Sequence, residues 1–116
     1  MALSRSVEIN ELIDRLVKFR DERNWARFHT VKDLALSVSI EASELLELTQ
    51  WKTSPDVEVL AKGPLRKEFT DEIADVCIYL LLLCDKLAID PVAAMHQKIE
   101  ANELRFPKDE GGERGT

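Results

Sequence analysis

Residues 72–84, with the sequence EIADVCIYLLLLC, form the most apolar segment of this 116-residue chain. From about Leu65 to Leu87 the pattern predicts a single helix that is apolar on nearly all sides beyond Ile73. A helix of this kind is normally central and is covered by neighbouring elements on several sides. The segment therefore predicts a helical fold organised around residues 65–87.

Two helices are expected before this central helix. The first runs from about Ser4 to Asn24 and carries an apolar stripe at helical spacing. The second begins near Thr30, whose hydroxyl is a suitable N-cap, and continues to about Trp51. The segment that follows, residues 52–64, contains proline and glycine residues that interrupt the pattern and leave room only for a brief turn.

One more helix is expected after the central one. Asp90 and Pro91 form a start signal, with Asp90 as the N-cap and Pro91 at the first helical position. This helix should end near Arg105, and no segment shows the alternation of a strand. We therefore expect an all-α protein of four helices, with a single domain over residues 1–106 and a flexible polar tail over residues 107–116.

The composition is typical of a soluble, mostly helical protein, because 45% of the residues are apolar and 33% are charged. The formal net charge of −6 argues against a general basic surface for duplex nucleic acid. The longest apolar stretch, residues 73–84, is too short to span a bilayer, and the N-terminus lacks a signal-peptide core. Cys77 and Cys84 are best explained as thiols in a reducing compartment, so we expect a cytoplasmic protein with no membrane partner.

Two acidic pairs carry the functional signal: Glu41-x-x-Glu44 and Glu72-x-x-Asp75. Carboxylates three residues apart in a helix project from one face. A lone pair of this kind is usually a solvated acidic face. Asp75, however, lies in apolar surroundings, where an unpaired charge is costly and where aspartate is a poor helix former. A divalent cation shared by the four carboxylates would compensate that charge.

The ligand types narrow the choice of metal. Four carboxylates provide an all-oxygen environment, which hard ions such as magnesium or manganese prefer. Di-iron bundles use Glu-x-x-His pairs, but the residue three positions before His29 and before His96 is an alanine. Zinc is disfavoured because no Cys/His ligand set is present. We therefore expect Mg²⁺, with Mn²⁺ as the alternative.

The two pairs and their flanks resemble the all-α nucleoside triphosphate pyrophosphohydrolases, the MazG-like superfamily. The stretches RNWARFHTVKDLALSVSIEASELLELTQWK and KIEANELRFP are similar to those of its dCTP pyrophosphatase branch. The resemblance covers about residues 5–107. It implies hydrolysis of a nucleoside triphosphate between the α- and β-phosphates, with the metal ions held by the four carboxylates, Glu41, Glu44, Glu72 and Asp75.

The resemblance also implies a substrate class and leaves a gap in the mechanism. It points to dCTP or a modified relative in nucleotide house-cleaning, while dUTP, non-standard purine triphosphates and phosphoribosyl-ATP are alternatives within the superfamily. Some relatives keep another glutamate immediately before the first metal ligand, where this chain has Ile40. Glu47 is a candidate for orienting water, but no general base is assigned.

Residues for the base, sugar and phosphates follow from the same resemblance. Their alternatives are core packing for the aromatic residues, helix capping for His29, and an incidental surface position for the basic ones. The expected substrate-binding residues are Trp25, Phe28, His29, Trp51, Tyr79, Lys98, Asn102 and Arg105.

The amphipathic helices predict an assembly of several copies. Their apolar stripes, notably on the first and third helices, are more than one small domain can cover. The resemblance implies a homodimer, or a homotetramer built from two dimers, packed as a helical bundle with substrate pockets near subunit boundaries. A hypothesis of another class is a non-catalytic helical module that binds a partner protein, although it leaves Asp75 unexplained.

Overall fold

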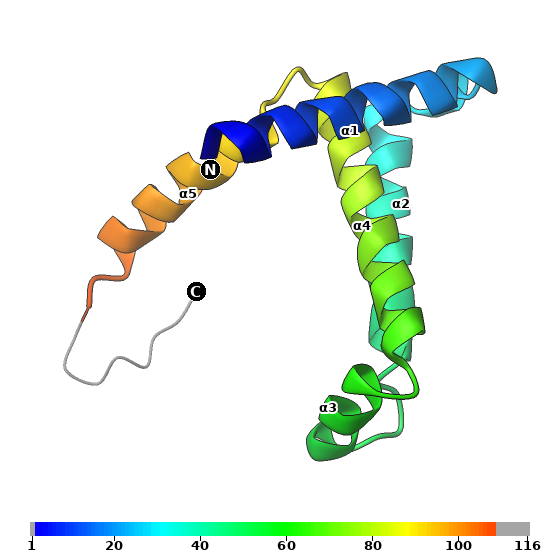
Figure 1. The fold of residues 1–116 in the computed structure, drawn as a ribbon, viewed down its shortest axis with the longest axis vertical. Coiled ribbons are helices and arrows are strands. Elements are labelled where there is room, and N and C mark those ends of the chain that lie inside the picture. Colours follow the sequence, from blue (N-terminus) through cyan, green and yellow to red (C-terminus); the bar gives the residue numbers. More distant parts are fainter. Residues whose placement is uncertain (1, 109–116) are drawn as a thin grey trace.

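The computed structural model describes residues 2–108, with side chains from Glu8 onward, and all its regular elements are helices (Figure 1). The all-α prediction is therefore confirmed for this part of the chain. The tail predicted over residues 107–116 lies mostly outside it, since residues 109–116 are not described. In order, the elements are α1 (Ala2–Glu22), the 3-10 turn η1 (Ala26–Phe28), α2 (Val31–Glu47), α3 (Ser54–Lys62), α4 (Arg66–Lys86) and α5 (Pro91–Arg105).

The centre of the fold is the antiparallel pair α2 and α4, which lie side by side (Figure 1). Helix α1 crosses the end of α4 where α4 terminates, and α3 packs near the opposite end. Helix α5 leads away from the α2–α4 pair. Among the described residues, the buried side chains of the hydrophobic core are Leu34 of α2 and Leu82 of α4.

The helix starts follow the signals in the sequence. The Thr30 hydroxyl accepts a hydrogen bond from the Asp33 amide at 3.0 Å, so Thr30 caps α2. The Asp90 carboxylate accepts from the amides of Val92 and Ala93 at 3.0 and 3.2 Å, with Pro91 in the first turn of α5. Both N-cap predictions are confirmed, and α5 ends at Arg105 as expected.

The expectation of four helices was one too few. Residues 54–62 form a complete helix, α3, where only a brief turn was predicted. Its signals are local: the Thr53 hydroxyl accepts from the Asp56 amide at 3.3 Å, Pro55 stands in the first turn, and Gly63 follows the last residue. Proline breaks a helix only in its interior. In the first turn the missing N–H has no partner within the helix, so no hydrogen bond is lost there.

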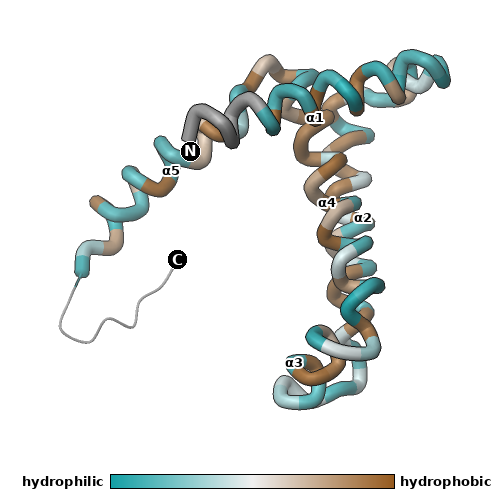
Figure 2. The backbone as a smooth tube through the Cα atoms, viewed as in Figure 1, coloured by the Kyte–Doolittle hydropathy of each residue, from teal (hydrophilic) through white to brown (hydrophobic). Residues whose placement is uncertain are grey.

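The prediction that residues 65–87 are covered on several sides is wrong within one chain. Helix α4 is hydrophobic along much of its length (Figure 2), yet Ile73 is 51% exposed and Leu80 is 43% exposed. The molecule is also elongated, with a radius of gyration of 17.3 Å. A compact domain of this length would have a radius of about 13 Å.

None of the described helices has both the length and the apolar content needed to cross a bilayer.

Candidate functional site

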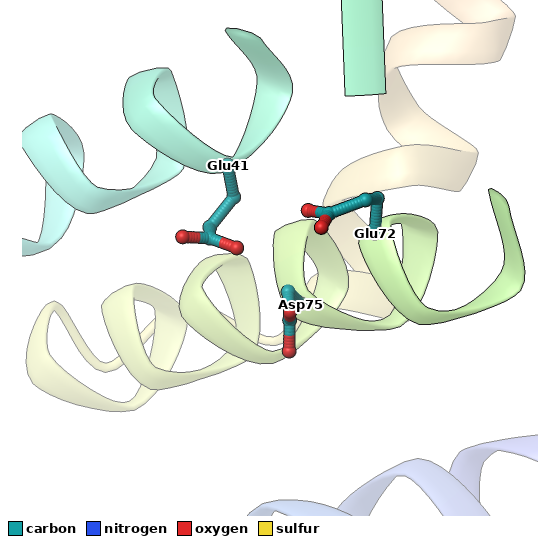
Figure 3. Close-up of side chains that lie close together, drawn as sticks. All are labelled: Glu41, Glu72 and Asp75. Atoms are coloured by element: carbon teal, nitrogen blue, oxygen red, sulfur yellow. The ribbon is translucent and has the colours of Figure 1, made fainter. Parts of the chain in front are cut away.

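Three carboxylates from two helices gather between α2 and α4 (Figure 3). Glu41 comes from α2, while Glu72 and Asp75 come from consecutive turns of α4. One oxygen from each lies within 4.8 Å of the others, and all three side chains are half-buried. Three oxygen donors so close together are suited to ligate a divalent cation.

The packing of α2 on α4 produces this cluster. The spacing of three residues places Glu72 and Asp75 on one face of α4, and that face looks toward α2. Because the two helices are antiparallel, Glu41 meets this face from the other side. Leu34 and Leu82, which are both buried, belong to the same pair of helices.

The electrostatics of the cluster are those of a site that lacks a counter-charge. Burial, followed by the negative charges of Glu44, Asp75 and Glu72, raises the pKa of Glu41 to about 7. Burial and the charge of Glu44 also raise the pKa of Glu72. One oxygen of Glu72, Oε2, is buried and has no hydrogen-bond partner among the described residues. A bound cation would satisfy such an oxygen, so the donor set fits a hard divalent cation.

Glu44, the fourth predicted ligand, is placed differently. It is exposed and does not belong to the group of three converging carboxylates. Its charge nevertheless acts on both Glu41 and Glu72, so it lies beside the cluster. The structure therefore brings together three of the four predicted carboxylates, with the fourth adjacent.

A cavity of about 420 Å³ opens next to the cluster, between α1, α4 and the segment that joins α1 to α2. This volume is within the usual range for small-molecule sites. Asp75 belongs to both the cavity and the carboxylate cluster. The lining residues are Leu12, Arg15, Leu16, Phe19, Arg20, Trp25, His29, Asp75, Ile78, Tyr79 and Leu82.

The cavity contains three of the predicted substrate-binding residues: Trp25, His29 and Tyr79. Asn24, with a φ of 58°, reverses the chain after α1 and brings Trp25 back toward it. The Trp25 ring meets the Phe19 ring edge-on at a centroid distance of 5.7 Å. The Arg23 guanidinium lies 3.6 Å from the centroid of the Phe19 ring. This cation–π contact helps to fix the position of the Phe19 ring.

His29 lines the cavity as a half-buried side chain. Burial, followed by the positive charge of Arg20, lowers its pKa, so the imidazole is neutral at pH 7. Its Nδ1 atom is buried and makes no hydrogen bond with the described residues. The alternative role of capping α2 is wrong for His29, because Thr30 supplies that cap.

Five predicted substrate-binding residues do not reach this site within one chain. Trp51 lies beyond the end of α2 and is 93% exposed, and Phe28 is exposed and outside the cavity lining. The others, Lys98, Asn102 and Arg105, lie on α5, which points away from the α2–α4 pair. Ile40, which stands where some relatives have a glutamate, and Glu47, the candidate for orienting water, are both exposed.

Sequence reasoning missed the contribution of α1. Leu12, Arg15, Leu16 and Phe19 line the cavity because their three- and four-residue spacings place them on one face of that helix. The apolar residues of this group belong to the stripe predicted for the first helix, and that stripe is the signal that the sequence offers for their packing. Nothing local indicated that this stripe would border the site, because that depends on where α1 crosses α4.

Comparisons with known proteins agree with the geometry. The model of the MazG-like family matches residues 36–115. Human and mouse dCTP pyrophosphatase 1 are each 35% identical to the chain over 91 residues, which are 78% of this chain and 54% of the relative. The chain thus spans about half the length of these curated relatives. The crystal structure of a pyrophosphatase from Archaeoglobus fulgidus matches with a TM-score of 0.80 and 48% identity, over 87% of this chain and 94% of that chain.

Proposed function

Because the chain belongs to the MazG-like family, we propose that it is a nucleotide pyrophosphatase that hydrolyses a nucleoside triphosphate to the monophosphate and pyrophosphate. The similarity to proteins named dCTP pyrophosphatase 1 and pyrophosphatase supports this reaction. The observation that carries the proposal is the shared position of Asp75. It belongs both to a carboxylate cluster suited to a cation and to an aromatic-lined cavity of nucleoside dimensions.

The cofactor of the proposed reaction is Mg²⁺, with Mn²⁺ as the alternative. Glu41, Glu72 and Asp75 would hold it, with Glu44 as the adjacent fourth carboxylate. When bound, the metal would neutralise charge on the phosphate oxygens and make the phosphorus more open to attack by water. The orphaned Oε2 of Glu72 and the raised pKa of Glu41 support the presence of a cation here.

Two regions of the site would then bind different parts of the substrate. The carboxylate cluster marks the phosphate end, and the wall formed by Phe19, Trp25 and Tyr79 provides aromatic surface for a nucleobase. No separate general base is proposed, because Ile40 supplies no proton acceptor.

The proposed substrate is dCTP or a modified dCTP, and the supporting observation is the shared identity with dCTP pyrophosphatase 1. Other triphosphates of the superfamily, including dUTP and non-standard purine nucleotides, and phosphoribosyl-ATP, would use the same carboxylates. They differ in the base that the aromatic wall must accept. Relative turnover is therefore the measurement that separates them.

The active form is proposed to contain more than one copy of the chain, as a homodimer or a dimer of dimers. The accessible surface of one copy is 9265 Å². A compact monomer of 13.2 kDa would expose about 6,400 Å². Lys98, Asn102 and Arg105 on α5, together with the exposed Trp51, can join a site only if a second copy brings them there.

The test is pyrophosphate release from a panel of triphosphates in the presence of Mg²⁺. We expect turnover to be highest with dCTP or a modified dCTP, and we expect Glu72→Gln to lower kcat by about 10²-fold or more. Glu58→Gln is the matched control, because Glu58 is exposed on α3 and, among the described residues, its ion-pair partner is the exposed Lys62. The proposal is overturned if no triphosphate releases pyrophosphate, and a partner-binding helical module then explains the fold better.

A further inference from the structure

Two arginines of α1 line the cavity, and their surroundings differ. The Arg20 guanidinium lies 2.9 Å from an oxygen of Asp21 and 3.5 Å from an oxygen of Asp85, and its side chain is only 16% exposed. These two carboxylates offset its charge, and the contact with Asp85 ties α1 to α4. Arg20 is thus part of the framework of the cavity.

Arg15 has no such partner. Among the described residues it makes neither an ion pair nor a side-chain hydrogen bond, and it is exposed at the cavity. His29 adds no positive charge at neutral pH, because burial lowers its pKa. Arg15 is therefore the one cationic group lining the described cavity whose charge is not already offset by an aspartate.

The charge balance of the site calls for such a group. The described part of the cavity and cluster contributes the carboxylates of Glu41, Glu72 and Asp75, and a triphosphate adds further negative charge. The lysine and arginine residues of α5 do not supply this positive charge within one chain, because α5 leads away from the α2–α4 pair. A guanidinium binds two phosphate oxygens at once through its planar array of N–H donors, which suits it to this role.

We propose that Arg15 is a substrate-binding residue that contacts the phosphate oxygens of the triphosphate from the α1 side of the cavity. This inference rests on the proposed function and adds a residue to it. The phosphate end is the better assignment than the base, because Arg15 shares the cavity with Asp75 of the carboxylate cluster. The base has aromatic surface available in Phe19, Trp25 and Tyr79.

The experiment compares Arg15→Gln with wild type in the pyrophosphatase assay and in direct binding measurements. The binding probes are the α,β-methylene analogue of dCTP with Mg²⁺, which cannot be cleaved at that bridge, and deoxycytidine, which has no phosphate. We expect a rise of about tenfold in KM and in the Kd of the triphosphate analogue. The Kd of deoxycytidine should be unchanged, and Arg15→Lys should restore part of the loss.

Lys18→Gln is the matched control, because Lys18 is an exposed cation of α1 that does not line the cavity. It should leave KM and both Kd values at their wild-type levels. The inference is overturned if Arg15→Gln binds the triphosphate analogue as tightly as wild type. It is also overturned if the deoxycytidine affinity falls equally, since the contact would then be with the nucleoside.

Failure of the proposed function gives a different result. In that case wild-type protein releases no pyrophosphate from any nucleotide. The role of Arg15 is then decided by the analogue alone, and equal affinity in the two proteins, including no binding by either, overturns it.

Discussion

At the scale of single residues, the carboxylate cluster is the part of the molecule whose arrangement opposes folding rather than stabilising it. Glu41, Glu72 and Asp75 place like charges within 4.8 Å of one another in half-buried positions. The cost of this arrangement appears as the raised pKa of Glu41 and of Glu72. Carboxyl groups with pKa values raised in this way are typical of functional sites, because a ligand of opposite charge removes the repulsion between them.

His29 provides a residue-scale prediction about pH. Charged groups face it from three elements: Arg20 of α1, Asp33 of α2 and Lys86 of α4. Since its pKa in the folded protein lies below the ordinary 6.5, the unfolded chain takes up a proton near pH 6.5 before the folded chain does. The stability associated with neutral His29 is therefore present above pH 6.5 and is lost as the pH falls through and below that value.

We expect His29→Asn to lose less stability than wild type between pH 7 and pH 5.5. Urea unfolding at each pH measures this as the change in midpoint, so any constant effect of the substitution cancels. His29→Gln, which also removes the imidazole, should follow the same profile as His29→Asn. A parallel loss of stability in wild type and His29→Asn would contradict the assignment.

At the scale of elements, the helix termini show how local signals operate. Helix α5 starts with two hydrogen bonds to the Asp90 carboxylate, at 3.0 and 3.2 Å. An N-cap of this kind satisfies amides that have no partner within the helix. Helix α3 uses the same device with Thr53, but its nine residues bury no side chain fully. The sequence predicted only a brief turn here, because Pro55, Gly63 and Pro64 interrupt the helical pattern within a few residues.

The cap of α5 leads to a prediction about stability. Asp90→Ala should lower the free energy of unfolding by about 1 kcal/mol, because two amides of the first turn lose their acceptor. Asp90→Asn should keep most of the stability, since asparagine is also a good N-cap. Chemical denaturation measures both values. If alanine and asparagine prove equivalent, the capping interaction is not what holds the start of α5.

At the scale of the whole molecule, the exposed apolar surface predicts association. One groove of about 440 Å³ between α1 and α5 is lined by Ile9, Leu12, Met95 and Ile99, among others. The free surface of helix α4 adds Ile73 and Leu80. Large apolar side chains exposed at several places on one molecule are typical of surfaces that meet a partner.

We therefore expect the protein to sediment as a dimer or tetramer, with a Tm that rises with protein concentration. Ile99→Asp should shift the mass toward the monomer, because a charge in the groove must then be buried on association. Glu100→Gln, an exposed neighbour outside the groove, is the control and should leave the mass unchanged. A monomeric mass over the whole concentration range, with a constant Tm, would contradict the predicted assembly.

The sequence by itself determined the all-α class, the N-caps at Thr30 and Asp90, and the helices that carry the two acidic pairs. These features depend on spacing and on contacts within a few residues of the chain. Only the tertiary structure decided which carboxylates converge and that Arg15 and Arg20 border the cavity. It also decided that Trp51 and the basic residues of α5 lie away from it. The physical reason is that a helical pattern specifies which face a side chain occupies, whereas the crossing of α1, α2 and α4 specifies what that face meets.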